Sequence, residues 1–402
     1  MSKSIVLYLH VHQPYRIGHY TMFDTGTRHD YFSSPPKGRT NNEQILHKVT
    51  SKSYLPTNER LLKLLQKHPE FKLSLSITGT VLEQLEKWSP ETLQSFQHLV
   101  QTGRVEMVAE TYHHSLAFFY SRPEFEMQVK MHREKVEQLF GQTPQVFRNT
   151  ELAYNNEVAA WADKAGYKGI LAEGWDPILG WRSPNYVYRP VYTENIRLLM
   201  KNYSLSDDIA FRFGDRQWKE WPLTAEKFAH WLSEDKDGAA YNLFMDYETF
   251  GEHQWSESGI FDFLEHMPEE WLKTDGHSFM TVSEAATGIK PVGEIDVPAT
   301  TTWADTERDL SAWLGNPMQQ EAIEALYDLQ DRIIGSGDLA LIEDWRKLQT
   351  SDHFYYMCTK WFNDGDIHAY FSPYESPYEA YINFMNAYHD LRFRLMEKGV
   401  EV

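Results

Sequence analysis

Short apolar segments alternate with amphipathic helical patterns along roughly the first 250 residues, and this alternation limits the folds that the chain can adopt. Seven segments have the length and apolar content of buried strands: 5–12, 71–77, 105–110, 145–150, 169–173, 197–202 and 240–247. Helical patterns separate several of them. Between the third and fourth, for example, Phe125, Val129, Val136 and Leu139 form an apolar stripe at helical spacing. Such alternation indicates a parallel sheet with helical crossovers.

Seven repeats without a glycine-rich dinucleotide fingerprint favour a β/α barrel over an open nucleotide-binding sheet. Beyond about residue 290 the strand pattern stops, and the remaining segments have helical patterns: 306–314, 319–336, 338–347 and 377–397. The predicted fold is therefore α/β. We expect a seven-stranded barrel over residues 1–290 and a helical region over 291–402 that packs on it through a large interface.

The charge of the chain excludes some classes of partner. It carries 39 Lys and Arg residues against 58 Asp and Glu residues, so its formal net charge is −19. An acidic surface repels phosphate backbones and anionic lipids, which argues against nucleic acid or a membrane as a partner. A neutral substrate is compatible with it. Hydrophobic residues make up 42% of the chain, which is enough for a sizeable core and excludes a disordered chain.

Cysteine usage and the N-terminus bear on the compartment. Cys358 is the one cysteine of the sequence, so no intrachain disulfide can form. This fits a reducing cytoplasm, which we expect as the location. The apolar run 5–9 is too short for the h-region of a signal peptide. No stretch of about 18 apolar residues occurs, so no membrane-spanning helix is expected.

Two predicted strands end in acid. Glu151 lies in the middle of a polar cluster that follows the fourth strand, and Asp246 closes the seventh. Catalytic residues of barrels lie at the C-terminal ends of strands. Two carboxylates delivered to one cleft are what cleavage of a glycosidic bond needs. Arg148, close to Glu151, would lower its pKa and keep it ionised as a nucleophile requires, unless the two form only a structural ion pair.

The surroundings of Asp246 predict the opposite pKa shift. Glu248 lies on the same face of the strand, and Phe244 and Met245 are apolar, so both a like charge and low polarity would raise the pKa of Asp246. A general acid must be protonated at its working pH. The alternative is a carboxylate that caps the next helix. His253 follows seven residues later in the same segment.

The first and third strands bring further polar side chains to the same edge. His10 and His12 are two residues apart and face one side, either as a metal pair, as hydrogen-bond partners of a substrate, or as groups that satisfy the strand end. Glu106 and Glu110 also share a face, and buried carboxylates are unfavourable unless paired, which favours an active-site rim. His113–His114 follow; their pattern does not decide between a surface role and a supporting one.

Five segments together closely resemble the ordered motifs of glycoside hydrolase family 57. They are His12–Gln13–Pro14, Gly103–Arg104–Val105–Glu106, Phe147–Arg148–Asn149–Thr150–Glu151–Leu152, Met245–Asp246–Tyr247–Glu248–Thr249–Phe250–Gly251–Glu252–His253 and Thr281–Val282–Ser283–Glu284. The third and fourth are long, so chance agreement is improbable. Their form is most similar to the α-amylase group of the family, although Val282 stands where proline is expected.

The resemblance implies an incomplete (β/α)7 barrel followed by a helical domain, and a retaining mechanism without a metal or another cofactor. It implies Glu151 as the nucleophile and Asp246 as the acid/base. The substrate would be an α-1,4-linked glucan or a maltooligosaccharide. Aromatic rings in polar loops suit sugar rings, and Trp303 is one of them. The residues predicted to bind substrate are His10, His12, Glu106, Arg148, Glu248, His253 and Trp303.

Three other functions remain to be weighed. A 4-α-glucanotransferase of the same family would share the covalent intermediate but pass it to a sugar hydroxyl. A metal-dependent barrel hydrolase is favoured by His10-x-His12, and His113 and His114 could supply further ligands. Against it, the fourth strand offers Glu151 and no histidine or lysine ligand. A non-catalytic glucan-binding protein would be expected to have lost Glu151 or Asp246. The sequence does not indicate the oligomeric state.

Overall fold

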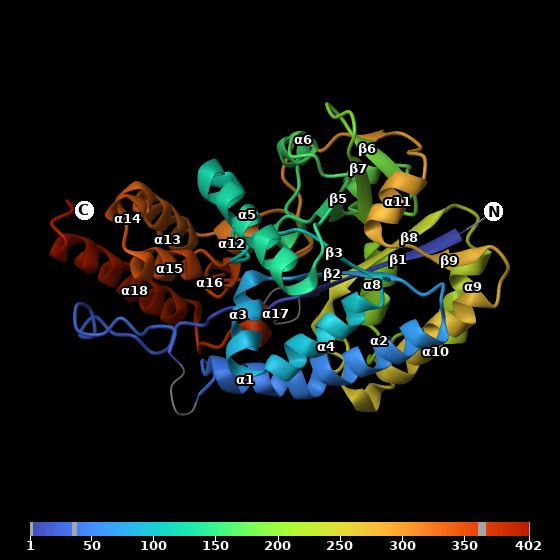
Figure 1. The fold of residues 1–402 in the computed structure, drawn as a ribbon, viewed down its shortest axis with the longest axis horizontal. Coiled ribbons are helices and arrows are strands. Elements are labelled where there is room, and N and C mark those ends of the chain that lie inside the picture. Colours follow the sequence, from blue (N-terminus) through green and yellow to red (C-terminus); the bar gives the residue numbers. More distant parts are fainter. Residues whose placement is uncertain (1–2, 34–37, 361–366, 402) are drawn as a thin grey trace.

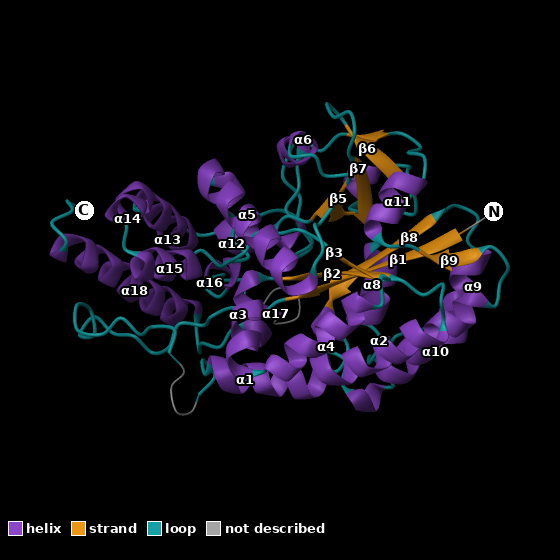
Figure 2. Ribbon diagram, in the orientation of Figure 1, coloured by secondary structure: helices purple, strands orange, loops and turns teal. Residues whose placement is uncertain are grey.

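The computed structural model describes residues 3–33, 38–360 and 367–401. Figures 1 and 2 show strands at the centre, with helices around them and a cluster of C-terminal helices on one side. The strands of the described ranges are β1 (Lys3–Val11), β2 (Leu73–Ile77), β3 (Val105–Met107), β4 (Val146–Phe147), β5 (Gly169–Glu173), β6 (Val187–Pro190), β7 (Arg197–Lys201), β8 (Ala240–Asp246), β9 (His277–Phe279) and β10 (Glu294–Ile295).

The helices up to residue 290 cover the strands. They are α1 (Asn42–Val49), α2 (Leu55–Lys67), α3 (Gly79–Trp88), α4 (Pro90–Gln101), α5 (Arg122–Phe140), α6 (Asn156–Lys164), α7 (Asp176–Leu179), α8 (Tyr203–Ala210), α9 (Ala225–Glu234), α10 (Ile260–Leu272) and α11 (Val282–Gly288). The pattern of α4 is typical: Pro90 begins the helix, and Leu93, Phe96 and Leu99 are buried on one face. The apolar faces of α2, α3, α4, α9 and α10 pack with β1, β2 and β8 in one core.

The seven predicted strands follow one another around the sheet in chain order. β1 pairs in parallel with β2 and with β8, and β2 pairs with β3. A parallel bridge between Ala109 and Phe147 links the end of β3 to β4, and β4, β5 and β7 pair in parallel. β6 is antiparallel to β7, and β9 and β10 are short additions that the sequence did not indicate. The prediction of a parallel α/β fold is therefore confirmed.

The barrel is incomplete at two places. Between β3 and β4 the described residues form only the isolated bridge. Between β7 and β8, the backbone N–H of Asn202 donates to the carbonyl of Asn242 at 2.9 Å, and the side chain of Asn242 donates to the carbonyl of Met200 at 2.9 Å. The side-chain amide of Asn242 thus replaces part of a ladder there. The strand ends still converge on one edge, which is where polar side chains gather.

The C-terminal region is helical, as predicted. Its helices are α12 (Ser311–Leu314), α13 (Pro317–Asp328), α14 (Gln330–Ser336), α15 (Leu339–Leu348), α16 (Ser351–Tyr355), α17 (Ile367–Phe371) and α18 (Pro377–Glu397). The predicted helix 319–336 is divided at Leu329 into α13 and α14. Trp313 and Trp345 from this region share one buried core with Phe147 and Ile170 of the strands.

A boundary at residue 290 stays a prediction. β10 lies beyond that residue and still pairs with β6 of the first part. The segment after it pairs with the loop that follows Glu151, through an antiparallel bridge between Tyr154 and Thr301, before the C-terminal helices begin. Within the described ranges, no helix has both the length and the apolar character that crossing a bilayer requires.

Candidate active site

The ends of β1 and β8 bring the first two predicted side chains together. His10 and Asp246 are partners in the parallel register of these strands. The Nδ1 atom of His10 lies 3.6 Å from Oδ1 of Asp246. Both are at the carboxyl ends of their strands, where barrels place their chemistry.

Glu151 lies in a short 3-10 turn, Thr150–Leu152, that follows β4. Its backbone has a φ of +58°, in the left-handed region that non-glycine residues seldom adopt. Such a conformation costs on the order of 1–3 kcal/mol and persists where surrounding contacts fix it. One such contact is between the backbone N–H of Trp303 and the carbonyl of Glu151, at 3.3 Å. The turn therefore aims one particular side chain at the strand ends.

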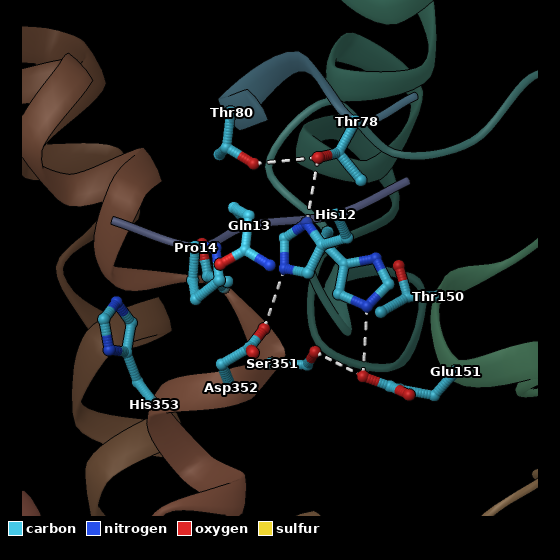
Figure 3. A network of polar contacts seen from close by, with 12 residues as sticks. His12, Gln13, Pro14, Thr78, Thr80, Thr150, Glu151, Ser351, Asp352 and His353 are labelled. Carbon is cyan, nitrogen blue, oxygen red and sulfur yellow. Dashed lines mark hydrogen bonds and ion pairs between the residues drawn. The ribbon is translucent and has the colours of Figure 1, made fainter. Parts of the chain in front are cut away.

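Three donors hold the carboxylate of Glu151. His114 Nε2 lies 3.0 Å from Oε1, and Ser351 Oγ donates to the same oxygen at 2.8 Å (Figure 3). Trp303 Nε1 donates to Oε2 at 2.8 Å. Burial alone would raise the pKa of Glu151, but the hydrogen bond and charge of His114, together with the charge of Arg148, lower it below its usual value. The carboxylate is thus ionised, as a nucleophile must be.

A chain of buried groups links Glu151 to Asp246. His114 Nδ1 lies 3.5 Å from Glu110 Oε2, and His10 Nε2 lies 3.1 Å from the same oxygen. Burial favours a neutral Glu110, but His10, His114 and Arg148 hold its pKa well below the usual range. For His114, burial opposes protonation, yet Glu110 and Glu151 raise its pKa to about 9. His114 is therefore a buried cation between two carboxylates.

The expected pKa shift of Asp246 is wrong. Burial pushes its pKa up, but the hydrogen bond and charge of His10, with the charges of His253 and Arg148, bring it below the usual value. The raised pKa belongs to Glu248 instead, at about 8, because it is more deeply buried and lies near Asp246. The side chain of Asp246 is 39% exposed, whereas Glu248 is buried and accepts a hydrogen bond from Tyr54.

The C-terminal helical region completes the site. His12 Nε2 lies 2.9 Å from Asp352 Oδ2, and its Nδ1 lies 2.8 Å from Thr78 Oγ1 (Figure 3). The ring of His12 stacks on that of His114 with centroids 4.1 Å apart. Burial and the positive His114 lower the pKa of His12 to about 4, so it is neutral. His12 lowers the pKa of Asp352 despite burial of that carboxylate.

Comparison with known proteins places this site in a family. The model of glycosyl hydrolase family 57 matches residues 6–298. The chain belongs to glycosyl hydrolase family 57. A Methanocaldococcus jannaschii protein that carries the provisional name alpha-amylase is 42% identical over 398 residues, which cover 96% of this chain and 84% of that protein. The resemblance seen in the motifs is thereby confirmed.

Solved structures of the family share the fold. A branching enzyme from Pyrococcus horikoshii has a TM-score of 0.68 and 16% identity, over 92% of this chain and 87% of that one. A 4-alpha-glucanotransferase from Thermococcus litoralis has a TM-score of 0.63 and 17% identity, over 88% of this chain and 56% of that one. At these identities the likeness extends to the fold alone.

In this family 57 enzyme, Glu106 does not lie with the predicted site residues that surround Glu151 and Asp246. Its Oε2 accepts a hydrogen bond from Ser74 Oγ at 3.1 Å and one from the backbone N–H of Ser283 at 3.0 Å, at the start of α11. It is in register with Ser74 on β2, whose partner on β1 is Tyr8, two residues before His10. These contacts indicate that Glu106 stabilises a helix N-terminus, and its substrate-binding role stays an untested prediction.

The other predicted substrate-binding residues lie around the two carboxylates. His253 packs its ring against Phe371 of α17, with centroids 5.5 Å apart, and its charge acts on Asp246. Trp303 contacts Glu151 directly. Arg148 is fully buried beside Trp303, with Cζ 5.0 Å from the ring centroid. Because His10, Arg148 and Glu248 are buried, direct contact of these three with a substrate stays a prediction.

Sequence reasoning missed Ser351 and Asp352 and left His114 undecided. Ser351 is 200 residues from Glu151 in the chain. It opens α16 in a polar stretch that resembles any helix start, so no local signal marks it. His114 has a φ of +52°, a backbone feature that the sequence pattern does not reveal.

Two groups among the described residues have the donor atoms of a metal site. They are His10, Glu110 and His114, and His12, His114 and Asp352, with the donor atoms in each within 4.8 Å of one another. His114 belongs to both. In the first group, Arg148 Nη1 lies 3.9 Å from Glu110 Oε2. The positive charge of this guanidinium disfavours a divalent cation there.

Proposed function

We propose that this family 57 enzyme cleaves α-1,4-glucosidic bonds of starch- or glycogen-type glucans, or of maltooligosaccharides, with retention of configuration. The observation that supports this most is the different setting of two carboxylates, one after β4 and one at the end of β8. Glu151 is held ionised by three donors, and Asp246 is the more exposed. A nucleophile and an acid/base are what retaining cleavage needs. The name of the M. jannaschii relative supports the substrate class.

In the first step, Glu151 attacks the anomeric carbon. Oε1 accepts two hydrogen bonds and Oε2 only one, so Oε2 keeps a lone pair for the new carbon–oxygen bond. The glycosidic bond breaks as this ester bond forms. The leaving oxygen takes its electron pair and receives the proton of Asp246.

In the second step, Asp246 removes a proton from water. The water oxygen attacks the same carbon, the ester bond to Glu151 breaks, and the sugar leaves with its original configuration. In the free enzyme the lowered pKa leaves Asp246 mostly ionised. A bound glucan covers the exposed part of this carboxylate, and the loss of water raises its pKa toward that of a working acid.

Transfer to a sugar hydroxyl is the second candidate function. Water and a hydroxyl compete for one intermediate, and the T. litoralis neighbour in fold is a 4-alpha-glucanotransferase. Incubation with maltoheptaose separates the two. We expect only shorter products, whereas products longer than maltoheptaose would assign a transferase. No cleavage of any maltooligosaccharide would contradict both. The Glu151→Gln variant, purified in parallel, controls for contaminating amylase.

We also propose that the reaction needs no metal. The group of His10, Glu110 and His114 already lies beside the guanidinium of Arg148, whose positive charge disfavours a divalent cation. Activity should survive exhaustive dialysis against EDTA, with metal content measured on the same sample. A loss of activity that Zn²⁺ restores would favour a metal-dependent hydrolase. The single buried cysteine is compatible with the cytoplasm, the location that we propose.

A further inference from the structure

Trp303 lies between the nucleophile and a pair of cations. Its indole N–H donates to Oε2 of Glu151, the oxygen assigned to the attack. Over the ring lie Arg148, with Cζ at 5.0 Å from the centroid, and Lys201, with Nζ at 5.5 Å. Both distances are typical of cation–π contacts. The direction of the indole N–H therefore depends on what holds these cations.

Lys201 is held by a buried network of charges. It ends β7 in parallel register with Glu173 at the end of β5, and both side chains are almost fully buried. Its Nζ lies 3.6 Å from Glu173 Oε2 and 3.3 Å from Asp207 Oδ1. Burial opposes the charge on Lys201, but Glu173 and Asp207 raise its pKa, so it remains a cation. The proposed reaction steps give this network no role.

Arg308 ties the network to the backbone of Trp303. Its Nη2 lies 4.0 Å from Asp207 Oδ2, and its Nη1 donates to the carbonyl of Trp303. Both the ring and the backbone of Trp303 are thus held from one side. Arg148 differs from Lys201 because it also lies 3.9 Å from Glu110, so its loss would disturb the site directly.

We propose that Lys201 is a positioning residue for the nucleophile, acting through Trp303. Its ammonium, fixed by Glu173 and Asp207, seats the indole so that the N–H meets Oε2 of Glu151. The inference rests on the proposed role of Glu151 as the nucleophile. It assigns to a buried lysine the task of keeping one hydrogen bond of the catalytic carboxylate in place.

A double-mutant cycle of Lys201→Met and Trp303→Phe tests the inference. Each single variant should lower kcat about tenfold, which lies within the range of interaction energies between contacting residues. KM should change less than about threefold. The acidic limb of kcat/KM against pH should move to higher pH in both, because Glu151 loses a donor to its ionised form. When Lys201→Met is added to Trp303→Phe, neither kcat nor the position of the acidic limb of kcat/KM should change further.

Two outcomes would overturn the inference: losses of kcat that multiply in the double variant, or a Lys201→Met enzyme with an unmoved acidic limb. The matched control is Lys227→Met. Lys227, on α9, also lies over an indole, 5.3 Å from the centroid of Trp231, and it pairs with Glu220 rather than with a residue of the site. Its kcat and pH profile should equal those of the wild type.

Loss of Lys201 leaves Glu173 buried without its cation, so the Lys201→Met variant can fail to fold. A second variant is therefore needed. If Lys201→Met does not fold, Lys201→Met/Glu173→Gln removes charges of both signs and replaces it in the cycle. Lys201→Arg should restore most of kcat, since it keeps the cation. A fully active Lys201→Met/Glu173→Gln enzyme would contradict the inference as well.

A readout without turnover separates this inference from the proposed function. The indole N–H of Trp303 reports its hydrogen bond to Glu151 in a ¹⁵N–¹H spectrum, and its signal is assigned by its absence in Trp303→Phe. In the wild type the signal should shift as Glu151 titrates, and in Lys201→Met the midpoint should move to higher pH. An inactive wild type would contradict the proposed function, whereas an unmoved midpoint would contradict the role of Lys201.

Discussion

At the scale of single residues, neighbours decide the charge of each buried carboxylate more than burial does. Glu151, whose side chain is 13% exposed, and the buried Glu248 are both glutamates of the site, yet their pKa values shift in opposite directions. Glu151 accepts hydrogen bonds from three donors, one of them the cationic His114. Glu248 faces the negative Asp246 with neutral partners. Hydrogen bonds to the charged form therefore separate their roles.

Replacing His114 by Gln should weaken the nucleophile through its charge state. His114 lowers the pKa of Glu151, so its loss lets that pKa rise and moves the acidic limb of kcat/KM to higher pH. The pH–rate profile measures this. His113→Gln is the matched control, because His113 is equally buried but has no hydrogen bond to Glu151. Equal shifts in the two variants would contradict the assignment.

Glu248 makes the stability of the fold depend on pH. Its pKa is raised from 4.5 to about 8 by burial and by Asp246, so between these values the folded state binds more protons than the unfolded state. The free energy of unfolding must then fall as pH rises through that window. Glu248→Gln has no titrating group at this position. Its free energy of unfolding should therefore rise relative to that of the wild type between pH 5 and pH 8. Denaturant titrations of both proteins at pH 5 and pH 8 measure these free energies. A difference between variant and wild type that is the same at both pH values would contradict the raised pKa.

At the scale of elements, the strands were predictable because their signal is local. Each of the seven predicted segments contains a short stretch rich in apolar residues, which is typical of buried strands. β6, β9 and β10 escaped because Arg189, His277 and Glu294 leave them without a comparable apolar stretch, and their pairing is decided by neighbours elsewhere in the chain. The turn that carries Glu151 was anticipated as a strand end, but its left-handed backbone was not.

The site was predictable only where strand ends carry it. His10, His12, Glu151 and Asp246 follow from alternation along strands and from the rule that barrels act at their carboxyl ends. Ser351 and Asp352 come from α16, which tertiary packing brings to the site. The pKa of Asp246 was misjudged for the same reason. Its controlling partner, His10, is 236 positions away and reaches it only through the pairing of β1 with β8.

Glu106 gives a direct test of what an element contributes. It accepts a hydrogen bond from the first turn of α11, so Glu106→Ala should lower stability by about 1–2 kcal/mol, as the loss of a helix cap does. Because it has no contact with Glu151 or Asp246, kcat should stay close to that of the wild type. Thermal unfolding and maltoheptaose cleavage measure the two effects. A large loss of kcat with an unchanged melting temperature would favour a substrate-binding role.

At the scale of the whole molecule, barrel and C-terminal helices form one cooperative structure. Trp313 and Trp345 lie in the same buried core as Phe147, and α16 supplies two side chains of the active site. Regions that share a core unfold together. Calorimetry should therefore show one transition, and activity should be lost with it. Two resolved transitions, one of them leaving an active barrel, would contradict this.

The central claim is that Glu151 forms a covalent glycosyl-enzyme. A 5-fluoroglucosyl fluoride of α configuration tests it most directly, because the ring fluorine slows the second step more than departure of fluoride slows the first. Intact mass spectrometry should show the addition of one fluoroglucosyl unit, and peptide mapping should place it on Glu151. A label on Asp246 or Asp352, or a first product of inverted configuration, would contradict the account.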